Sequence, residues 1–334
     1  MRQVFEYDPD IGYRYIPGLK ARMPHESGGY LIRANEMGFR SQREFIPEKN
    51  PGKRRILLFG DSFTVGEGVS NEKRYSDLLE KQIPELEIYN FGLPGTGTDQ
   101  QYLACRKYAS GIDHDAIMIV VMVENIRRIV ARYRYYLDEN NAQVYYAKPY
   151  FELSGGELVL RHVPPKKEPV RDSEIPLEDR AFVDRGGRFP RIRTFLIKTK
   201  LEKLAPNTLT RFIPYTPYTP YPEYNSPSHP AWRLMEAILE KWIKEQKKPV
   251  LLVPLPPHIF IEEFRVANYH KRFSELTLKT GCAYFDPLPD LKCYSMEERR
   301  GFRFAQDKHP SQAGHVAIAQ AFAPAVRKVL EGAR

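Results

Sequence analysis

A serine, an asparagine and an aspartate–histidine pair stand next to apolar runs or amphipathic segments of this sequence, at Ser62, Asn125, Asp307 and His309. A serine hydroxyl becomes a good nucleophile when a base takes its proton, and a histidine does this near neutral pH. A nearby carboxylate can fix the imidazole tautomer and stabilise the imidazolium that forms. These residue types therefore predict nucleophilic attack by Ser62, with His309 as the base.

Negative charge that develops on an attacked oxygen needs hydrogen-bond donors. The candidate donors are the backbone N–H groups of Ser62 and Gly92 and the side-chain amide of Asn125. The alternative for Asn125 is a simple cap at the end of its strand. Loss of one such donor typically lowers turnover about 10²–10³-fold. Arg127 and Arg128 follow directly and are either contacts for a polar or anionic substrate group or ordinary surface charges.

These residues need a scaffold that brings them to one place. Apolar runs predict five strands, and amphipathic segments between and after them predict helices. The expected strands are 55–59, 86–91, 116–123, 249–253 and 282–285, and the expected helices are 75–81, 98–110 (with Thr98 as N-cap), 231–246, 265–279 and 312–330. This alternation predicts a doubly wound, mostly parallel sheet, which holds its ligand site at the carboxyl ends of its strands.

The chain divides into three parts by composition. Residues 1–50 are turn-rich and predict an irregular N-terminal wrap, and residues 51–125 and 231–334 form the α/β core. Residues 126–230 interrupt the alternation after the third strand and predict an inserted subdomain or cap. Within it we expect a hairpin over 150–160 around Gly155-Gly156, and polyproline or irregular chain over 211–230. The tyrosines of this insertion suit either its own core or stacking on sugar rings.

Composition excludes several classes of protein. The 334 residues are 42% hydrophobic, and the three cysteines form no CxxC pair, which excludes a disulfide scaffold and a zinc finger and favours a reducing, cytoplasmic setting. The longest strongly apolar run, eight residues at 116–123, is too short to span a membrane. The net charge of +9 is concentrated in 125–230, but no nucleic-acid motif accompanies it, and no phosphate loop, GxSxG or HExxH motif is present.

Three motifs resemble those of the SGNH (GDSL-type) hydrolases. Gly60-Asp61-Ser62 is similar to the family's nucleophile motif, 90–95 to the block whose glycine donates to the oxyanion, and 307–310 to the block that holds the aspartate and histidine. The interrupted architecture and Asn35–Arg40 resemble members associated with bacterial surface-sugar gene clusters. The resemblance implies a flavodoxin-like three-layer α/β/α sandwich with a central five-stranded sheet, no metal or cofactor, and ester hydrolysis or acyl transfer.

The sequence departs from the family pattern in two places. Residues 123–126 read Val-Glu-Asn-Ile where the family usually has Gly-x-Asn-Asp, so only the asparagine remains. Asp307 and His309 are two residues apart, whereas the family spacing is usually three. The shorter spacing resembles that of some sugar O-acetyltransferase and acetylesterase relatives. The sequence therefore leaves open whether Asp307 or another acid, such as Asp286, orients His309.

The resemblance implies a serine esterase that acts through a Ser62 acyl-enzyme, with His309 and Asp307. We expect a short acyl group, acetyl above all, on a carbohydrate or related small metabolite. The alternatives are an O-acyltransferase that uses the same Ser62, or a non-catalytic member that binds a glycan. The sequence does not fix the oligomeric state.

Overall fold

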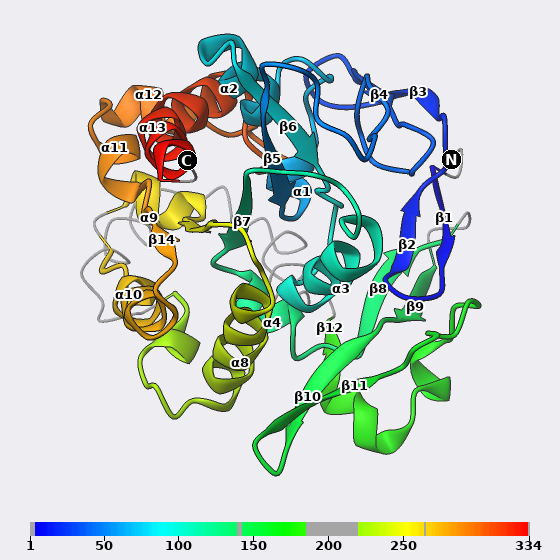
Figure 1. Cartoon of the computed structure of the whole chain (residues 1–334). Coiled ribbons are helices and arrows are strands. Elements are labelled where there is room, and N and C mark those ends of the chain that lie inside the picture. The colour runs from blue at the N-terminus through cyan, green and yellow to red at the C-terminus, as the bar shows by residue number, and fades with distance from the viewer. Residues whose placement is uncertain (1–3, 139–141, 185–219, 264, 333–334) are drawn as a thin grey trace, which may run out of the picture.

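A five-stranded parallel sheet forms the centre of the computed structural model, which describes residues 4–138, 142–184, 220–263 and 265–332. Its strand order is β6-β5-β7-β13-β14, and all neighbours are parallel (Figure 1). The strands are β5 (Arg54–Phe59), β6 (Leu86–Asn90), β7 (Ala116–Met122), β13 (Val250–Leu255) and β14 (Ala283–Tyr284). The prediction of a mostly parallel five-stranded sheet is thus confirmed, and each strand lies within a few residues of its expected position.

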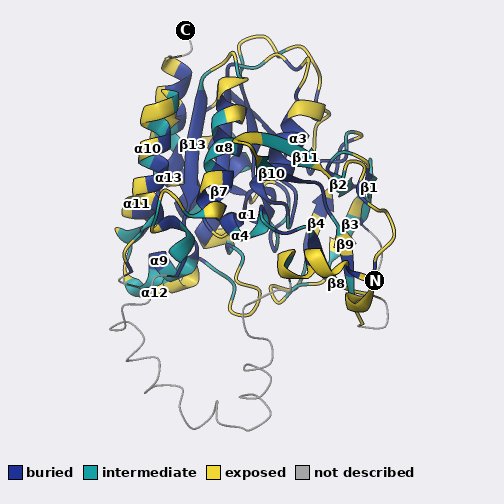
Figure 2. Cartoon of the chain, turned by 90° about the horizontal axis from the view of Figure 1, so that it is seen from below, coloured by how far each residue is buried: buried dark blue, intermediate teal, exposed yellow. Residues whose placement is uncertain are grey.

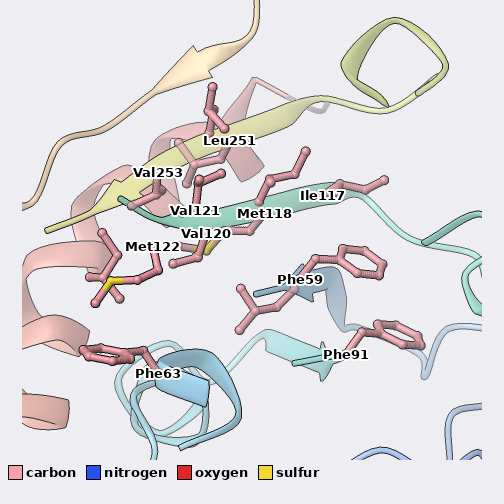
Figure 3. Packing of buried hydrophobic residues seen from close by; sticks show 14 of the residues in the cluster. Phe59, Phe63, Phe91, Ile117, Met118, Val120, Val121, Met122, Leu251 and Val253 are labelled. Carbon is pink, nitrogen blue, oxygen red and sulfur yellow. The ribbon is translucent and has the colours of Figure 1, made fainter. Parts of the chain in front are cut away.

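The central strands are apolar because both faces of the sheet are covered. Every residue of β7 and β13 is buried, as expected for parallel strands between two helical layers. Figure 3 shows side chains of these strands packed with Phe59 of β5 and with Phe91 and Phe63, which follow β6 and β5. This packing fixes where the carboxyl ends of the strands lie relative to one another.

Two groups of long helices cover the sheet (Figure 1). One group contains α2 (Tyr75–Gln82) and α13 (Gln312–Glu331), which pack against each other. The other contains α3 (Thr98–Tyr108), α8 (Pro230–Lys244) and α10 (Tyr269–Thr280), in which α8 contacts both neighbours. The expected three-layer arrangement is present, although Gly97 rather than Thr98 is the N-cap of α3.

Short helices begin where strands of the sheet end. They include α1 (Ser62–Val65) after β5, α4 (Asn125–Arg128) after β7 and α9 (His258–Glu262) after β13. Further short elements are α11 (Leu288–Lys292), α12 (Met296–Gly301) and the 3₁₀ turns Asp172–Glu174, Leu177–Phe182 and Pro222–Tyr224. Because the carboxyl ends of parallel strands lie at one edge of the sheet, the first residues of α1 and α4 lie at that same edge.

The N-terminal residues are more regular than we predicted. They form two antiparallel hairpins, β1 (Phe5–Asp8) with β2 (Gly12–Tyr15), and β3 (Lys20–Met23) with β4 (Tyr30–Arg33). The strands are only four residues long, too short for a clear alternating pattern in the sequence. Tertiary contacts supply what the pattern lacks, since Tyr15 belongs to the main hydrophobic core.

The described part of 126–230 contains a small sheet of its own and the predicted hairpin. The sheet has the order β12-β8-β9, from Val183–Asp184, Tyr133–Leu137 and Gln143–Ala147. The hairpin pairs β10 (Tyr150–Ser154) with β11 (Glu157–Arg161). Of the expected irregular stretch 211–230, residues 211–219 lie outside the described residues, and Pro222–Tyr224 is a 3₁₀ turn.

This region contains both buried and exposed residues (Figure 2), and its tyrosines are divided between the two. Tyr133 and Tyr145 are buried with Val170 and Ile175 in a separate small core, so the core interpretation holds for these two. Tyr136 and Tyr146 are exposed, with their rings 5.5 Å apart in an edge-to-face arrangement. In the described part of the chain, no helix has the length and hydropathy needed to cross a membrane.

Candidate active site

Ser62 is the first residue of α1, directly after the turn that follows β5. The Asp61 side chain caps this short helix by accepting a hydrogen bond from the Phe63 N–H at 3.0 Å. A Cβ atom at Gly60 would lie 2.0 Å from Thr64 Oγ1, so the tight turn requires glycine there. The Gly-Asp-Ser sequence therefore sets the position of Ser62, which is 3% exposed.

His309 approaches this turn from the opposite end of the sequence. Its ring centre lies 5.3 Å from that of Phe63, the residue next to Ser62. Its Nδ1 lies 2.9 Å from Asp307 Oδ2. Asp286 is engaged elsewhere, with His270 Nδ1 at 3.1 Å. Of the two acids that the sequence left open, Asp307 is therefore the one that contacts His309 in this structure.

A second carboxylate, which the sequence reasoning missed, lies on the other side of the His309 ring. Glu67 Oε2 is 3.1 Å from His309 Nε2. Glu67 follows α1 between Gly66 and Gly68, five residues after Ser62. A charged residue between two glycines so close to the serine turn was the available signal, but sequence alone does not tell which way such a side chain points.

The charges of this cluster affect one another. Burial raises the pKa of Glu67, and this effect outweighs the opposing charge of His309. Burial alone would lower the pKa of His309, but the hydrogen bond to Asp307 and the charges of Glu67 and Asp307 raise it above its ordinary value. The hydrogen bond from His309 is the main cause that lowers the pKa of Asp307. The resting site thus favours a protonated His309 beside an ionised Asp307.

Asp307 also contacts the N-terminal part of the chain, which the sequence reasoning treated as a wrap. His25 Nε2 lies 3.0 Å from Asp307 Oδ2, the oxygen that also contacts His309. No motif marked His25, because its role depends on a contact between residues 282 positions apart.

Asn125 is the first residue of α4 and is fully buried. Among the described residues, neither its amide nitrogen nor its amide oxygen has a hydrogen-bond partner. A buried amide without hydrogen-bond partners lowers the free energy of unfolding, so the presence of Asn125 just after the end of β7 needs an explanation. A substrate oxygen that receives the Asn125 N–H would supply one.

The Gly92 N–H differs from our expectation. It donates to Asn90 Oδ1 at 2.9 Å, so it is already occupied and the structure does not support its assignment as an oxyanion donor. The Asn90 amide nitrogen donates in turn to Thr64 O at 2.8 Å, which joins this loop to the turn after Ser62. Gly95, in the same loop, has a φ of 76°, a conformation that favours glycine.

The two arginines after Asn125 are bound within the protein. Arg128 Nη1 lies 2.8 Å from Asp61 Oδ2, and Arg127 Nε lies 2.7 Å from Glu223 Oε1. Neither arrangement supports the predicted contact with substrate. Arg128 instead pairs with the buried carboxylate of Asp61, the residue before Ser62.

A small apolar cavity lies beside the site. It has about 10 Å³ of space, and its lining includes Phe63, His258 and Pro310, the residue after His309. This is room for roughly one water molecule or one methyl group. Among the described residues, no cluster of three or more His, Cys, Asp or Glu side chains has the arrangement to hold a metal ion.

Comparisons with known proteins give similarity at the level of solved structures. No family model matches the sequence, and no curated protein matches it. A member of the lipolytic G-D-S-L family from Veillonella parvula is 13% identical, over 81% of this chain and 97% of its own, with a TM-score of 0.40. The lipase/acylhydrolase from Enterococcus faecalis is 16% identical, over 82% and 96%, with a TM-score of 0.42.

A two-domain esterase (CEX) active on acetylated mannans is 14% identical, over 84% of this chain and 50% of its own, with a TM-score of 0.40. The structures similar to this chain thus include members of the G-D-S-L family, the family that the motif around Ser62 resembles. What the fold and the site define together is an α/β/α protein with a serine, a histidine and a carboxylate near one edge of its sheet.

Proposed function

We propose that this protein is a serine esterase of the SGNH (GDSL) type. Ser62 is the nucleophile, His309 the general base and Asp307 the residue that orients the imidazole. The observation that carries the proposal is the meeting of two segments that are distant in the sequence. The Asp307–His309 pair, at 2.9 Å, lies against Phe63, the residue that follows Ser62 in the turn after β5.

In the proposed reaction, Ser62 Oγ attacks the ester carbonyl while His309 Nε2 takes its proton. Before that step, Nε2 must release Glu67, which it contacts in this structure. Negative charge forms on the former carbonyl oxygen, and N–H donors aimed at that position lower the barrier. The donors we assign are the Ser62 N–H and the buried, unpartnered Asn125 amide.

The tetrahedral intermediate then breaks its bond to the alcohol, which leaves with the proton returned by His309. A water molecule attacks the acyl-enzyme in the second half, again with His309 as base, and releases the acid and free Ser62. A short acyl group is in keeping with the small cavity that Phe63, His258 and Pro310 line beside the site, which has about 10 Å³ of space, roughly enough for a methyl group. A carbohydrate alcohol is supported by the motif resemblance alone.

The test is hydrolysis of p-nitrophenyl acetate by the wild type and Ser62→Ala, purified in parallel. Ser110→Ala, an exposed serine at the end of α3, is the matched control. We expect the Ser62 variant to lose turnover by at least about 10³-fold, and the control to retain it. A fluorophosphonate probe should label the peptide that contains Ser62. Equal hydrolysis by the wild type and Ser62→Ala would refute the mechanism.

The low exposure of Ser62 also favours a second candidate, acyl transfer to an alcohol. At 3% exposure the serine is poorly accessible to bulk water, so a bound alcohol would compete well for the acyl-enzyme. Product analysis with added saccharide acceptors separates the two. An esterase releases the acid at the same rate with or without acceptor, whereas a transferase forms the acylated sugar at the expense of the acid.

A further inference from the structure

We propose that His25, from the N-terminal segment, is a positioning residue of this site that acts on His309 through Asp307. The inference rests on the proposed function, because it assigns His309 as the base. Asp307 Oδ2 accepts from two imidazoles, His309 Nδ1 at 2.9 Å and His25 Nε2 at 3.0 Å. The observed arrangement is therefore a chain of three side chains, from His25 through Asp307 to His309, and in the proposed reaction His309 then acts on Ser62.

The hydrogen bonds around His25 define which of its nitrogens carries the proton. The Ser27 backbone N–H points to His25 Nδ1 at 3.2 Å, and a backbone N–H can only donate. Nδ1 is therefore the acceptor of a neutral ring. The proton lies on Nε2, which donates to the Asp307 carboxylate. His25 Nε2 is thus a hydrogen-bond donor to the Asp307 carboxylate.

The His25 ring is held firmly, in contrast to the carboxylate that it contacts. Its centre lies 4.4 Å from the ring of Phe304 and 5.8 Å from that of Tyr30, both edge to face. The His25 side chain is 9% exposed and the Asp307 side chain 34%. A partly exposed aspartate on a loop can adopt several rotamers. The better-packed His25 therefore restricts the side chain of Asp307, and not the reverse.

The same segment also holds the backbone of the Asp307 loop. Glu26 Oε1 accepts from the Asp307 N–H at 2.7 Å and from the Gln306 N–H at 2.9 Å. Residues 25 and 26 therefore fix both the main chain and the carboxylate of Asp307. Because catalysis depends on the orientation of His309 to within a fraction of an ångström, a loss of this support lowers turnover without removing a reacting group.

The experiment compares His25→Phe with His25→Gln. Phenylalanine keeps a ring for the packing against Phe304 and Tyr30 but has no donor, whereas the glutamine amide can place an N–H near the position of Nε2. We expect His25→Phe to lower kcat about tenfold with little change in KM, and His25→Gln to recover most of the loss. His25→Asn, whose amide is too short to reach Asp307, should resemble the phenylalanine variant and serves if that variant fails to fold.

A second readout does not depend on turnover. Once Asp307 is free to move away, His309 loses part of its neighbouring charge, and its pKa should fall by about half a unit. Proton NMR of the histidine rings measures this titration, with the His309 signal assigned by its absence in His309→Gln. A loss of packing alone would lower the melting temperature and leave this midpoint unchanged.

The outcomes separate the two proposals. If Ser62→Ala retains activity, the proposed function fails, and the His309 titration still tests the role of His25. If turnover depends on Ser62 but His25→Phe matches the wild type in kcat and in the His309 midpoint, the positioning role is wrong. A midpoint that rises in His25→Phe also contradicts it, because a rise means that Asp307 remains in place without His25.

Discussion

Glu67 Oε2 lies 3.1 Å from His309 Nε2, the nitrogen that accepts the proton of Ser62 in the proposed mechanism. Asp307 occupies the other ring nitrogen at 2.9 Å, so the imidazole lies between two carboxylates. Both nitrogens can donate only when the ring is protonated. The raised pKa of His309 favours such a protonated ring, and in the proposed mechanism His309 loses this proton and its contact with Glu67 before it acts as a base.

The Glu67 carboxylate should control the acidic limb of the pH–rate profile. Its charge is one of the causes that raise the pKa of His309, and activity requires the neutral ring. In Glu67→Gln the pKa of His309 falls, so the neutral form persists to lower pH. We expect the acidic limb of kcat/KM for p-nitrophenyl acetate to move down by about half to one pH unit.

A carboxylate outside the site provides the control for this shift. Glu85→Gln removes an equal charge from a side chain that is 51% exposed and contacts Arg327. Its profile should coincide with that of the wild type. An acidic limb that stays in place or moves up in Glu67→Gln would show that Glu67 does not contribute to the charge of the resting His309.

Asn125 and Asn90 should respond in opposite ways to replacement by alanine. Asn125 has no partner among the described residues, so Asn125→Ala should leave the melting temperature nearly unchanged while kcat falls about 10²–10³-fold. Asn90 bonds to Thr64 O and to the Gly92 N–H, so Asn90→Ala should cost about 2 kcal/mol of stability. Thermal melts and kinetics measured on the same preparations check both. A large loss of stability in Asn125→Ala would mean that the amide is structural.

Arg128 should matter more for stability than its neighbour Arg127. Asp61, which is 1% exposed, has Arg128 as its cation, and Arg128→Met leaves that charge buried and unpaired. We expect a loss of about 3 kcal/mol. Arg127→Met removes the ion pair with Glu223, in which the arginine side chain is 35% exposed. We expect this variant to lose about 1 kcal/mol of stability or less. Urea denaturation distinguishes the two, and equal losses would argue against a special role of the Asp61 contact.

The Lys148–Asp99 pair should stabilise the junction between α3 and the segment after β9. Lys148 is 4% exposed and Asp99 0%, and the lysine also donates to the Ala131 carbonyl at 3.2 Å. Lys148→Met leaves Asp99 without its cation, and we expect a cost of about 3 kcal/mol. The double variant Asp99→Asn/Lys148→Met should recover part of that loss. Urea denaturation of both variants measures this, and a double variant less stable than Lys148→Met would contradict it.

Some features followed from local patterns. The run 116–123 is apolar throughout, which is typical of a strand covered on both faces, and β7 is such a strand. Gly60-Asp61-Ser62 marked the tight turn, because glycine is needed where Thr64 approaches the backbone. The predicted parallel sheet, together with the rule that ligand sites lie at the carboxyl ends of its strands, placed Ser62 and Asn125 at one edge of the sheet from the sequence alone.

The contacts that complete the site depend on tertiary structure. His25, Glu67 and the choice of Asp307 over Asp286 all involve side chains from loops, whose direction no periodic pattern encodes. Sequence also does not show that the Asn90 side chain turns back to accept from the Gly92 N–H. The sequence by itself determined the sheet and the residue types at its edge, since burial imposes a pattern on strands and helices. Only the tertiary structure decided which polar groups meet there, because hydrogen bonds between distant loops depend on distances of a few ångströms that leave no periodic trace in the chain.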